Sequence, residues 1–238
     1  MKTMKSLVLI ALFTVLFQKI TAQQIADTLY LDSVKLEFYK KWPKNRSVNL
    51  VFHGHSVVVG YFRTPVISTF EAYPFLTFKN VKERFPLAIL NSITTAIGGE
   101  NAEQGAKRFK TQVLCHRPDV LFIDYALNDR PIGLERAKAA WIQMITEAKE
   151  YGTKVILLTP TPDLSENILD KDTKLAQHAE QIRALAKTYQ VGLVDSYALF
   201  KNIAETEPLD KYMAQNNHIN EKGHELVAKA ILSYFTLK

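Results

Sequence analysis

The segment that decides the fold runs from Val48 to Ser56 and reads VNLVFHGHS. Its first five residues are apolar except for Asn49, so they predict a strand that is buried on both faces. Similar short apolar runs recur at Leu87–Leu90, Val120–Ile123, Val155–Leu158 and Val191–Val194. Strands of this kind are typical of a parallel sheet that has helices on both faces.

Apolar residues at helical spacing lie between these runs. The sets are Ala102, Ala106, Phe109 and Val113; Ala137, Trp141, Met144 and Ala148; and Leu175, Ala179, Ile182 and Leu185. A short helical stretch at Tyr197–Ala204 and a final helix through Leu226–Tyr234 follow the last strand. The alternation of strands and helices implies right-handed crossovers and a sheet between two helix layers. Segment Asp27–Trp42 fits either a helix or a strand.

The chain has 238 residues, of which 47% are hydrophobic and 23% charged, so it can bury a core, and disorder is excluded. No linker, charge block or repeat divides it, and we expect one domain from Gln23 to Lys238. Cys115 is the only cysteine, which excludes an internal disulfide and a cysteine-rich zinc site. We expect no cofactor.

The N-terminus has the order of a secretory signal peptide. Lys2 and Lys5 precede the apolar run Leu7–Phe17, and Ala22 is the expected cleavage site. The run is too short for a membrane span of about 20 residues, and no cysteine follows it that would take a lipid. We therefore expect a secreted or periplasmic protein without membrane insertion after cleavage. Beyond Ala22 the net charge falls from +6 to +3, which gives no case for nucleic-acid binding.

In a doubly wound sheet, ligands bind beyond the carboxyl ends of the strands. The first strand leads to Ser56, a candidate nucleophile, and the second leads to Gly99, whose N–H is open to an oxyanion. Asn128 follows the third strand and offers an amide donor. His218 precedes the last helix and is a candidate base. The G-x-S-x-G turn of α/β-hydrolases is absent, because Val58 replaces its second glycine.

Serine, glycine, asparagine and histidine in this order resemble the SGNH hydrolases, the superfamily of GDSL-like esterases and lipases. Its G-D-S, G, G-x-N-D and D-x-x-H-P blocks look like Gly54-His55-Ser56, Gly99, Ala126-Leu127-Asn128-Asp129 and Gln215-Asn216-Asn217-His218-Ile219. The resemblance implies a flavodoxin-like three-layer α/β/α fold with five parallel strands. It also implies ester hydrolysis through an acyl-enzyme, with Ser56 as nucleophile and His218 as base. The oxyanion hole would be the N–H groups of Ser56 and Gly99 and the amide of Asn128.

The chain departs from the family pattern where the family places the aspartate that orients the base. Gln215 stands three residues before His218 and cannot supply a carboxylate. Four alternatives are open: the amide of Gln215, a backbone carbonyl, the carboxylate of Asp210 or Glu100, or a serine–histidine dyad.

Two other polar residues are candidates for substrate binding. Arg130 follows Asn128 closely and suits a carboxylate or sugar hydroxyls, although a salt bridge explains it equally well. His55 replaces the aspartate of G-D-S. Together with His53 it also suggests a metal site, but no further ligand stands at a suitable spacing, so we expect none.

By analogy with the family, we expect an esterase that removes a small acyl group, with acetyl as the expected one, from a polysaccharide or a small-molecule ester. A lysophospholipase or thioesterase is the first alternative. A carbohydrate-binding relative that has lost catalysis is the second, because the acid is missing.

Overall fold

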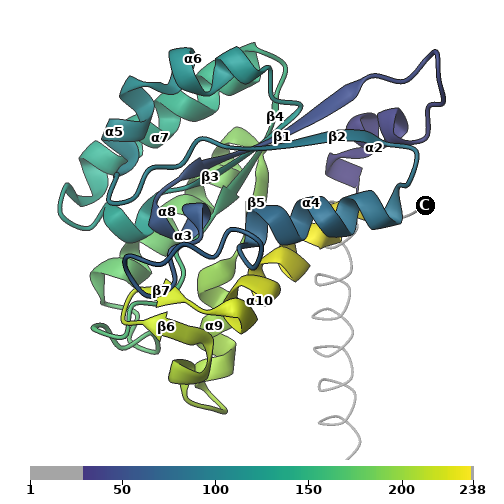
Figure 1. Cartoon of the computed structure of the whole chain (residues 1–238). Coiled ribbons are helices and arrows are strands. Elements are labelled where there is room, and N and C mark those ends of the chain that lie inside the picture. Colours follow the sequence, from purple (N-terminus) through teal and green to yellow (C-terminus); the bar gives the residue numbers. More distant parts are fainter. Residues whose placement is uncertain (1–28, 237–238) are drawn as a thin grey trace, which may run out of the picture.

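Five parallel strands form the central sheet of the computed structural model, which describes residues 29–236 (Figure 1). The strands are β1 (Ser47–Gly54), β2 (Ile89–Thr94), β3 (Val120–Asp124), β4 (Lys154–Leu158) and β5 (Gly192–Val194). Their order is β2-β1-β3-β4-β5, so β1 and β3 are adjacent although β2 lies between them in sequence. The strand order reverses there, which places the ligand crevice at the carboxyl ends of β1 and β3.

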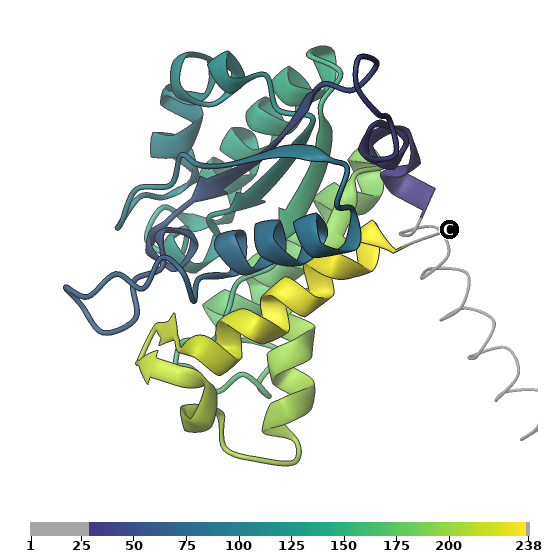
Figure 2. The ribbon, with the colours of Figure 1, turned by 45° about the vertical axis from the view of Figure 1, so that its right-hand side comes forward.

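Helices cover both faces of this sheet (Figures 1 and 2). One layer holds α2 (Asp32–Phe38), α4 (Tyr73–Arg84) and α10 (Glu221–Leu232), and the other holds α5 (Ala102–Lys107), α6 (Phe109–Gln112), α7 (Gly133–Glu150) and α8 (Lys174–Tyr189). The expected three-layer α/β/α fold with five parallel strands is confirmed. Shorter elements complete the chain: α3 (Ser56–Val59), α9 (Ser196–Ala204), the hairpin β6 (Met213–Gln215) and β7 (His218–Ile219), and the 3-10 turns η1 (Leu114–His116), η2 (Ala126–Asn128), η3 (Leu209–Tyr212) and η4 (Ser233–Phe235).

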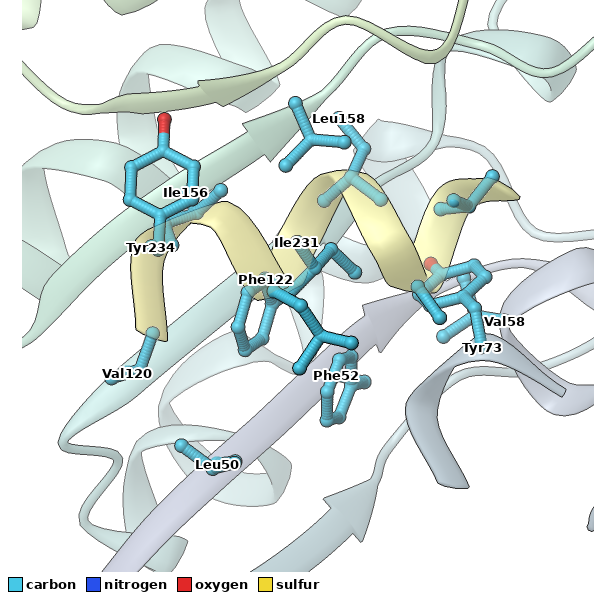
Figure 3. Close-up of a cluster of buried hydrophobic side chains, with 14 of the residues drawn as sticks. Leu50, Phe52, Val58, Tyr73, Val120, Phe122, Ile156, Leu158, Ile231 and Tyr234 are labelled. Carbon is cyan, nitrogen blue, oxygen red and sulfur yellow. The ribbon is translucent and has the colours of Figure 1, made fainter. Parts of the chain in front are cut away.

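Successive residues of each strand fill opposite core layers, because side chains alternate across a sheet. Phe52 of β1 and Phe122 of β3 stack at 4.4 Å between ring centroids, on the face that packs against Ile231 of α10 (Figure 3). Their neighbours Val51 and Leu121 are also fully buried, but on the opposite face. Burying a side chain of this kind stabilises the fold by about 1.5–3 kcal/mol. The two core layers therefore fix the register of β1, which leads directly to Ser56.

The structure refines the expected boundaries. Segment Asp27–Trp42, whose type was open, contains helix α2. Ala102–Val113 is not one helix, because it breaks at Arg108 between α5 and α6. The proposed signal segment Met1–Ala22 lies outside the described residues. None of the helices within residues 29–236 is both long and apolar enough to cross a membrane.

Candidate active site

Ser56 is the first residue of α3, at the tight turn that follows β1. The turn needs a glycine at position 54, because a Cβ there would collide with the Asp124 carbonyl oxygen. His55 caps the helix, since its Nδ1 accepts from the Val57 N–H at 3.3 Å. Strand, glycine and cap together place the Ser56 side chain at the carboxyl edge of the sheet.

His218 contacts Ser56 across 162 residues of sequence. Its Nε2 lies 2.8 Å from Ser56 Oγ, and its Nδ1 lies 3.2 Å from the main-chain carbonyl oxygen of Phe62. A carbonyl can only accept, so Nδ1 carries the proton and Nε2 is free to accept from the serine hydroxyl. This arrangement can remove a proton from Ser56.

The surroundings of His218 favour its neutral form. Burial lowers the pKa of His218 below 6.5; the hydrogen bond to the Phe62 carbonyl opposes the shift, and the nearby His55 adds to it. Within residues 29–236, no carboxylate forms an ion pair or hydrogen bond with His218. The ring is therefore held by a neutral main-chain group.

The three side chains considered for the missing acid all lie elsewhere. Gln215 Oε1 accepts from the Thr64 N–H at 3.0 Å. Glu100 is bound by Arg108, with an oxygen–nitrogen distance of 2.5 Å, and Asp210 is exposed in η3. Among the alternatives taken from the sequence, the geometry agrees with a backbone carbonyl.

The proposed oxyanion donors come from three loops that are tied together. The Ile97 N–H donates to the Gly54 carbonyl at 3.1 Å, which holds the loop of Gly99 beside the serine turn. Asn128 Nδ2 donates to the Glu100 carbonyl at 3.0 Å, which joins η2 to the same loop and leaves the second amide proton available. Gly99 has φ +82°, a conformation that other residues rarely adopt. Within residues 29–236, the N–H groups of Ser56 and Gly99 have no hydrogen-bond acceptor.

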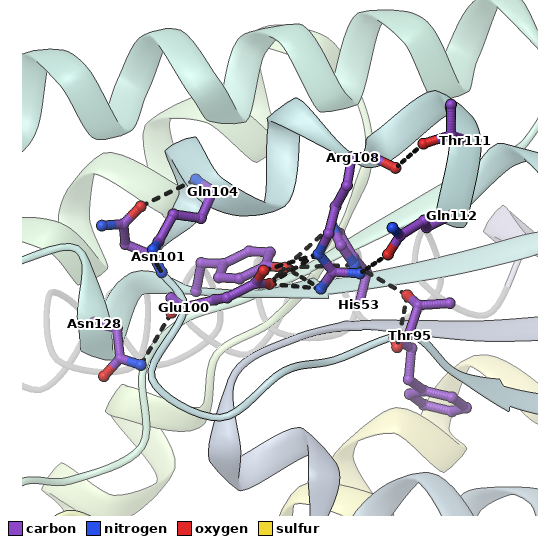
Figure 4. A network of polar contacts seen from close by, with 11 residues as sticks. His53, Thr95, Glu100, Asn101, Gln104, Arg108, Thr111, Gln112 and Asn128 are labelled. Carbon is purple, nitrogen blue, oxygen red and sulfur yellow. Dashed lines mark hydrogen bonds and ion pairs between the residues drawn. The ribbon is translucent and has the colours of Figure 1, made fainter.

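A partly buried polar cluster around Glu100 holds the loop that contains Gly99 (Figure 4). Arg108 Nε and Nη2 donate hydrogen bonds to the Glu100 carboxylate, and Tyr125 Oη donates to Glu100 Oε2 at 3.2 Å. Tyr125 also contacts His53, whose pKa burial lowers to about 3, so that this histidine is neutral. From the sequence, Glu100 is a candidate only as a partner of the base. Its role in holding the loop was missed, because Arg108 and Tyr125 carry no sequence signal for it.

Asp129 holds the turn that carries Asn128. Its carboxylate accepts from the Ala102 N–H and from Trp141 Nε1, both at 2.7 Å, which joins η2 to α5 and α7. Burial raises the pKa of Asp129 to about 6. The residue after Asn128 therefore anchors the turn that presents the amide.

The two candidates for substrate binding differ. His55 is fully buried, with Nε2 3.4 Å from Asp124 Oδ1, so the expectation that it binds substrate does not fit the structure. Arg130 forms ion pairs with Asp163 and Glu166, not with its sequence neighbours. It nevertheless lines a cavity of about 600 Å³ together with Gly99, Asn101, Leu127, Asn128, Pro131, Glu166 and Lys174. No group of three metal-ligating side chains occurs in the described part of the chain.

Comparison with known proteins finds a matching family and a related sequence. The model of the GDSL-like lipase/acylhydrolase family matches residues 52–226. The lipoprotein YqeF of Bacillus subtilis is 32% identical over an alignment 185 residues long; the match covers 67% of this chain and 75% of the relative.

Solved structures with a similar fold include two esterases. A two-domain esterase active on acetylated mannans has a TM-score of 0.70 and 21% identity; the match covers 87% of this chain and 52% of that one, so this chain spans about half its length. The acetylxylan esterase Axe2 of Geobacillus stearothermophilus has a TM-score of 0.67 and 18% identity; the match covers 80% of this chain and 95% of Axe2. Catalytic mutants of Axe2 replace a serine, a histidine and an aspartate. In the present chain, residues of the first two types are in contact.

Proposed function

Because the chain belongs to the GDSL-like lipase/acylhydrolase family and is a serine ester hydrolase, we propose that Ser56 is its nucleophile and His218 its general base. The observation that carries this proposal is the 2.8 Å contact between Ser56 Oγ and His218 Nε2. A nucleophile within hydrogen-bond reach of an oriented base is the arrangement that serine hydrolysis needs.

In the proposed reaction, Ser56 Oγ attacks the ester carbonyl carbon as its proton passes to His218 Nε2. The carbonyl oxygen becomes an oxyanion, which accepts from the N–H groups of Ser56 and Gly99 and from Asn128 Nδ2. The intermediate then collapses: the bond to the alcohol breaks, and His218 gives its proton to the departing oxygen. Water, deprotonated by His218, attacks the acyl-enzyme in the same way and releases the acid and Ser56.

The catalytic pair works as a dyad in this proposal. The Phe62 carbonyl keeps the proton of His218 on Nδ1. In a triad, replacing the acid lowers kcat by about 10⁴, because the histidine then takes the wrong tautomer. The carbonyl is neutral, however, and stabilises the imidazolium less than a carboxylate does. We therefore expect an active enzyme that is slower than one with a complete triad.

For the substrate, we propose an acetyl ester of a carbohydrate. The two esterases of similar fold act on acetylated mannans and acetylated xylan, which supports this choice by analogy. We assign the sugar to the cavity of about 600 Å³ beside Gly99 and Asn128, where the exposed Lys174 and the ion-paired Arg130 and Glu166 provide hydrogen-bonding groups beside the apolar Leu127 and Pro131. We further propose that the protein is exported and cleaved after Ala22; the N-terminal sequence of the exported protein tests this directly.

The test is a rapid-mixing assay with p-nitrophenyl acetate, followed by acetate release from acetylated xylan and mannan. A burst of p-nitrophenol indicates an acyl-enzyme. Ser56→Ala and His218→Ala should each lower kcat by about 10³ or more, and the double variant should lose little beyond either, because the two residues act as a unit. An active Ser56→Ala protein would exclude the nucleophile. Faster cleavage of long-chain esters than of acetyl esters would favour a lipid esterase, and no turnover at all would favour a binding protein.

A further inference from the structure

We propose that Gln215 positions the base indirectly, by clamping the segment Tyr61–Thr64 that presents the Phe62 carbonyl to His218. The inference rests on the proposed role of His218 as general base. It assigns a function to the position where the family carries its aspartate, and that function does not involve contact with the imidazole.

Gln215 uses both ends of its amide on Thr64. Its Oε1 accepts from the Thr64 N–H at 3.0 Å, and its Nε2 lies 3.3 Å from Thr64 Oγ1 and 3.2 Å from Asn217 Oδ1. The Thr64 N–H needs an acceptor, and the Thr64 hydroxyl oxygen can accept from a donor. The side-chain amide of Gln215 provides both groups. The amide is thus committed to Thr64, two residues after Phe62.

The base and the clamp are placed on one rigid unit. Gln215 and His218 face each other in the antiparallel pairing of β6 and β7. Asn220, two residues after His218, caps α10 and binds the Gly223 N–H at 3.2 Å, which attaches the hairpin to a long core helix. When Gln215 holds Thr64, the hairpin that carries the imidazole therefore also holds the segment that orients it.

Other contacts hold this segment on its remaining sides. The Tyr61 N–H donates to the Ser56 carbonyl at 3.0 Å, and the Phe62 ring stacks on His224 at 4.9 Å between centroids. These contacts fix the end nearest the nucleophile and the side chain of Phe62, and the Phe62 N–H donates to the Val66 carbonyl at 3.2 Å. Thr64, by contrast, is exposed, and Gln215 supplies the side-chain contacts to its N–H and hydroxyl. Loss of Gln215 should thus loosen the Phe62 carbonyl without unfolding the protein.

The aspartate that the family carries at this position should not restore activity here. Aspartate at position 215 is one methylene shorter than glutamine and has no donor, so Gln215→Asp should release Thr64 and lower kcat like Gln215→Ala. Both should lose about 10-fold in kcat, or about 1.4 kcal/mol, with little change in KM. Gln215→Glu keeps the length and accepts from both the N–H and the hydroxyl of Thr64, so it should stay within about 3-fold of wild type.

The experiment measures kcat and KM on p-nitrophenyl acetate for these three variants, with Asn217→Ala as the matched control that removes the other partner of Gln215. A structural readout is the ¹H NMR resonance of the His218 Nδ1 proton, which should be protected in wild type and Gln215→Glu and exchange-broadened in Gln215→Ala. Thr64→Val, which removes only the hydroxyl, should lose less than Gln215→Ala, and adding it to Gln215→Ala should cost nothing more.

Two results would overturn the proposal. A gain in kcat for Gln215→Asp would show that position 215 acts directly on His218. Unchanged kcat and an unchanged Nδ1 proton in Gln215→Ala would show that the clamp has no effect. These results can be distinguished from a failure of the proposed function. If Ser56 is not the nucleophile, Ser56→Ala remains active whatever the Gln215 variants do, and the NMR signal of the Nδ1 proton still reports whether Gln215 holds the segment.

Discussion

At the scale of single residues, the environment of His218 determines how the reaction depends on pH. Hydrolysis needs neutral His218, and burial, assisted by His55, lowers its pKa below 6.5 despite the opposing bond to Phe62. A lowered pKa means that the base stays neutral, and the enzyme active, as the pH falls through 6.5. A carboxylate partner would act in the opposite direction by stabilising the imidazolium.

We therefore predict that kcat/KM for p-nitrophenyl acetate declines only below pH 6.5. The pH profile of kcat/KM reports groups of the free enzyme, so it is the measurement to make. The solvent-exposed His116→Asn variant is the control and should leave the profile unchanged. A midpoint above 6.5 would mean that an anionic group stabilises protonated His218 in solution.

At the scale of elements, the Gly99 loop depends on its anchor in α5 and the turn that follows. Glu100 and Arg108 are each about 12% exposed in their side chains, and Glu100 also receives the Tyr125 hydroxyl. Glu100→Gln leaves the Arg108 charge without a partner in a partly buried place. It should also free the loop whose carbonyl holds Asn128.

The prediction is a loss of about 1–3 kcal/mol in stability, typical of a broken hydrogen bond to a charged group, together with a kcat reduced by about 10-fold. Glu103→Gln is the matched control. Glu103 of α5 also forms an ion pair with an arginine, Arg136 of α7. The side chain of Arg136 is 62% exposed, and exposed ion pairs contribute little to stability. Denaturant unfolding and steady-state kinetics measure both effects. Equal losses in the two variants would mean that the Glu100 anchor has no special role in catalysis.

The elements also show what the sequence can predict. Strands β1, β3 and β4 are buried on both faces, so continuous apolar runs located them. Edge strand β2 is half exposed and contains Asn91 and Ser92, so the apolar run at Leu87–Leu90 was displaced from the strand at Ile89–Thr94. Similarly, the small hairpin β6–β7 is too short to have a detectable period.

The same reasoning explains which parts of the candidate site were predictable. Ser56, Gly99, Asn128 and His218 act through their own chemistry at strand ends, so their residue types reveal them. The partner of His218 Nδ1 is a main-chain carbonyl, which every residue has, and no side chain at position 62 signals it. The contacts of Gln215 were equally hidden, because Thr64 lies 151 residues away in sequence.

At the scale of the whole molecule, two of the buried histidines, His53 and His224, link stability to acidity most strongly. His53 lies in β1 beside Phe109 and Tyr125, while His224 lies in α10 against Phe62 and Tyr73, in the opposite layer. Both are fully buried, and burial lowers the pKa of each to about 3. His224 Nδ1 accepts from the Tyr73 N–H at 3.1 Å, which also requires an unprotonated nitrogen.

These lowered pKa values predict acid destabilisation. Above pH 6.5 both histidines are neutral in the folded and the unfolded chain, and the stability is at its full value. As the pH falls from 6.5 towards 3, only the unfolded chain takes up these protons, so stability decreases by about 1.4 kcal/mol per pH unit for each histidine. At pH 4.5 the two together cost about 5 kcal/mol, a large part of the 5–15 kcal/mol typical of a folded domain.

Thermal melts between pH 7.5 and 4.5 test this prediction. His224→Asn keeps an acceptor for the Tyr73 N–H but does not titrate. At pH 7.5 the melting temperature of this variant should be lower than that of wild type, because the ring contact with Phe62 is lost. As the pH falls, its melting temperature should decrease less steeply than that of wild type. The exposed His116→Asn variant is the control and should follow the wild-type slope. Parallel curves for wild type and His224→Asn would show that His224 is protonated within the fold, and the core around Phe62, which also orients the base, would then have to admit a charge.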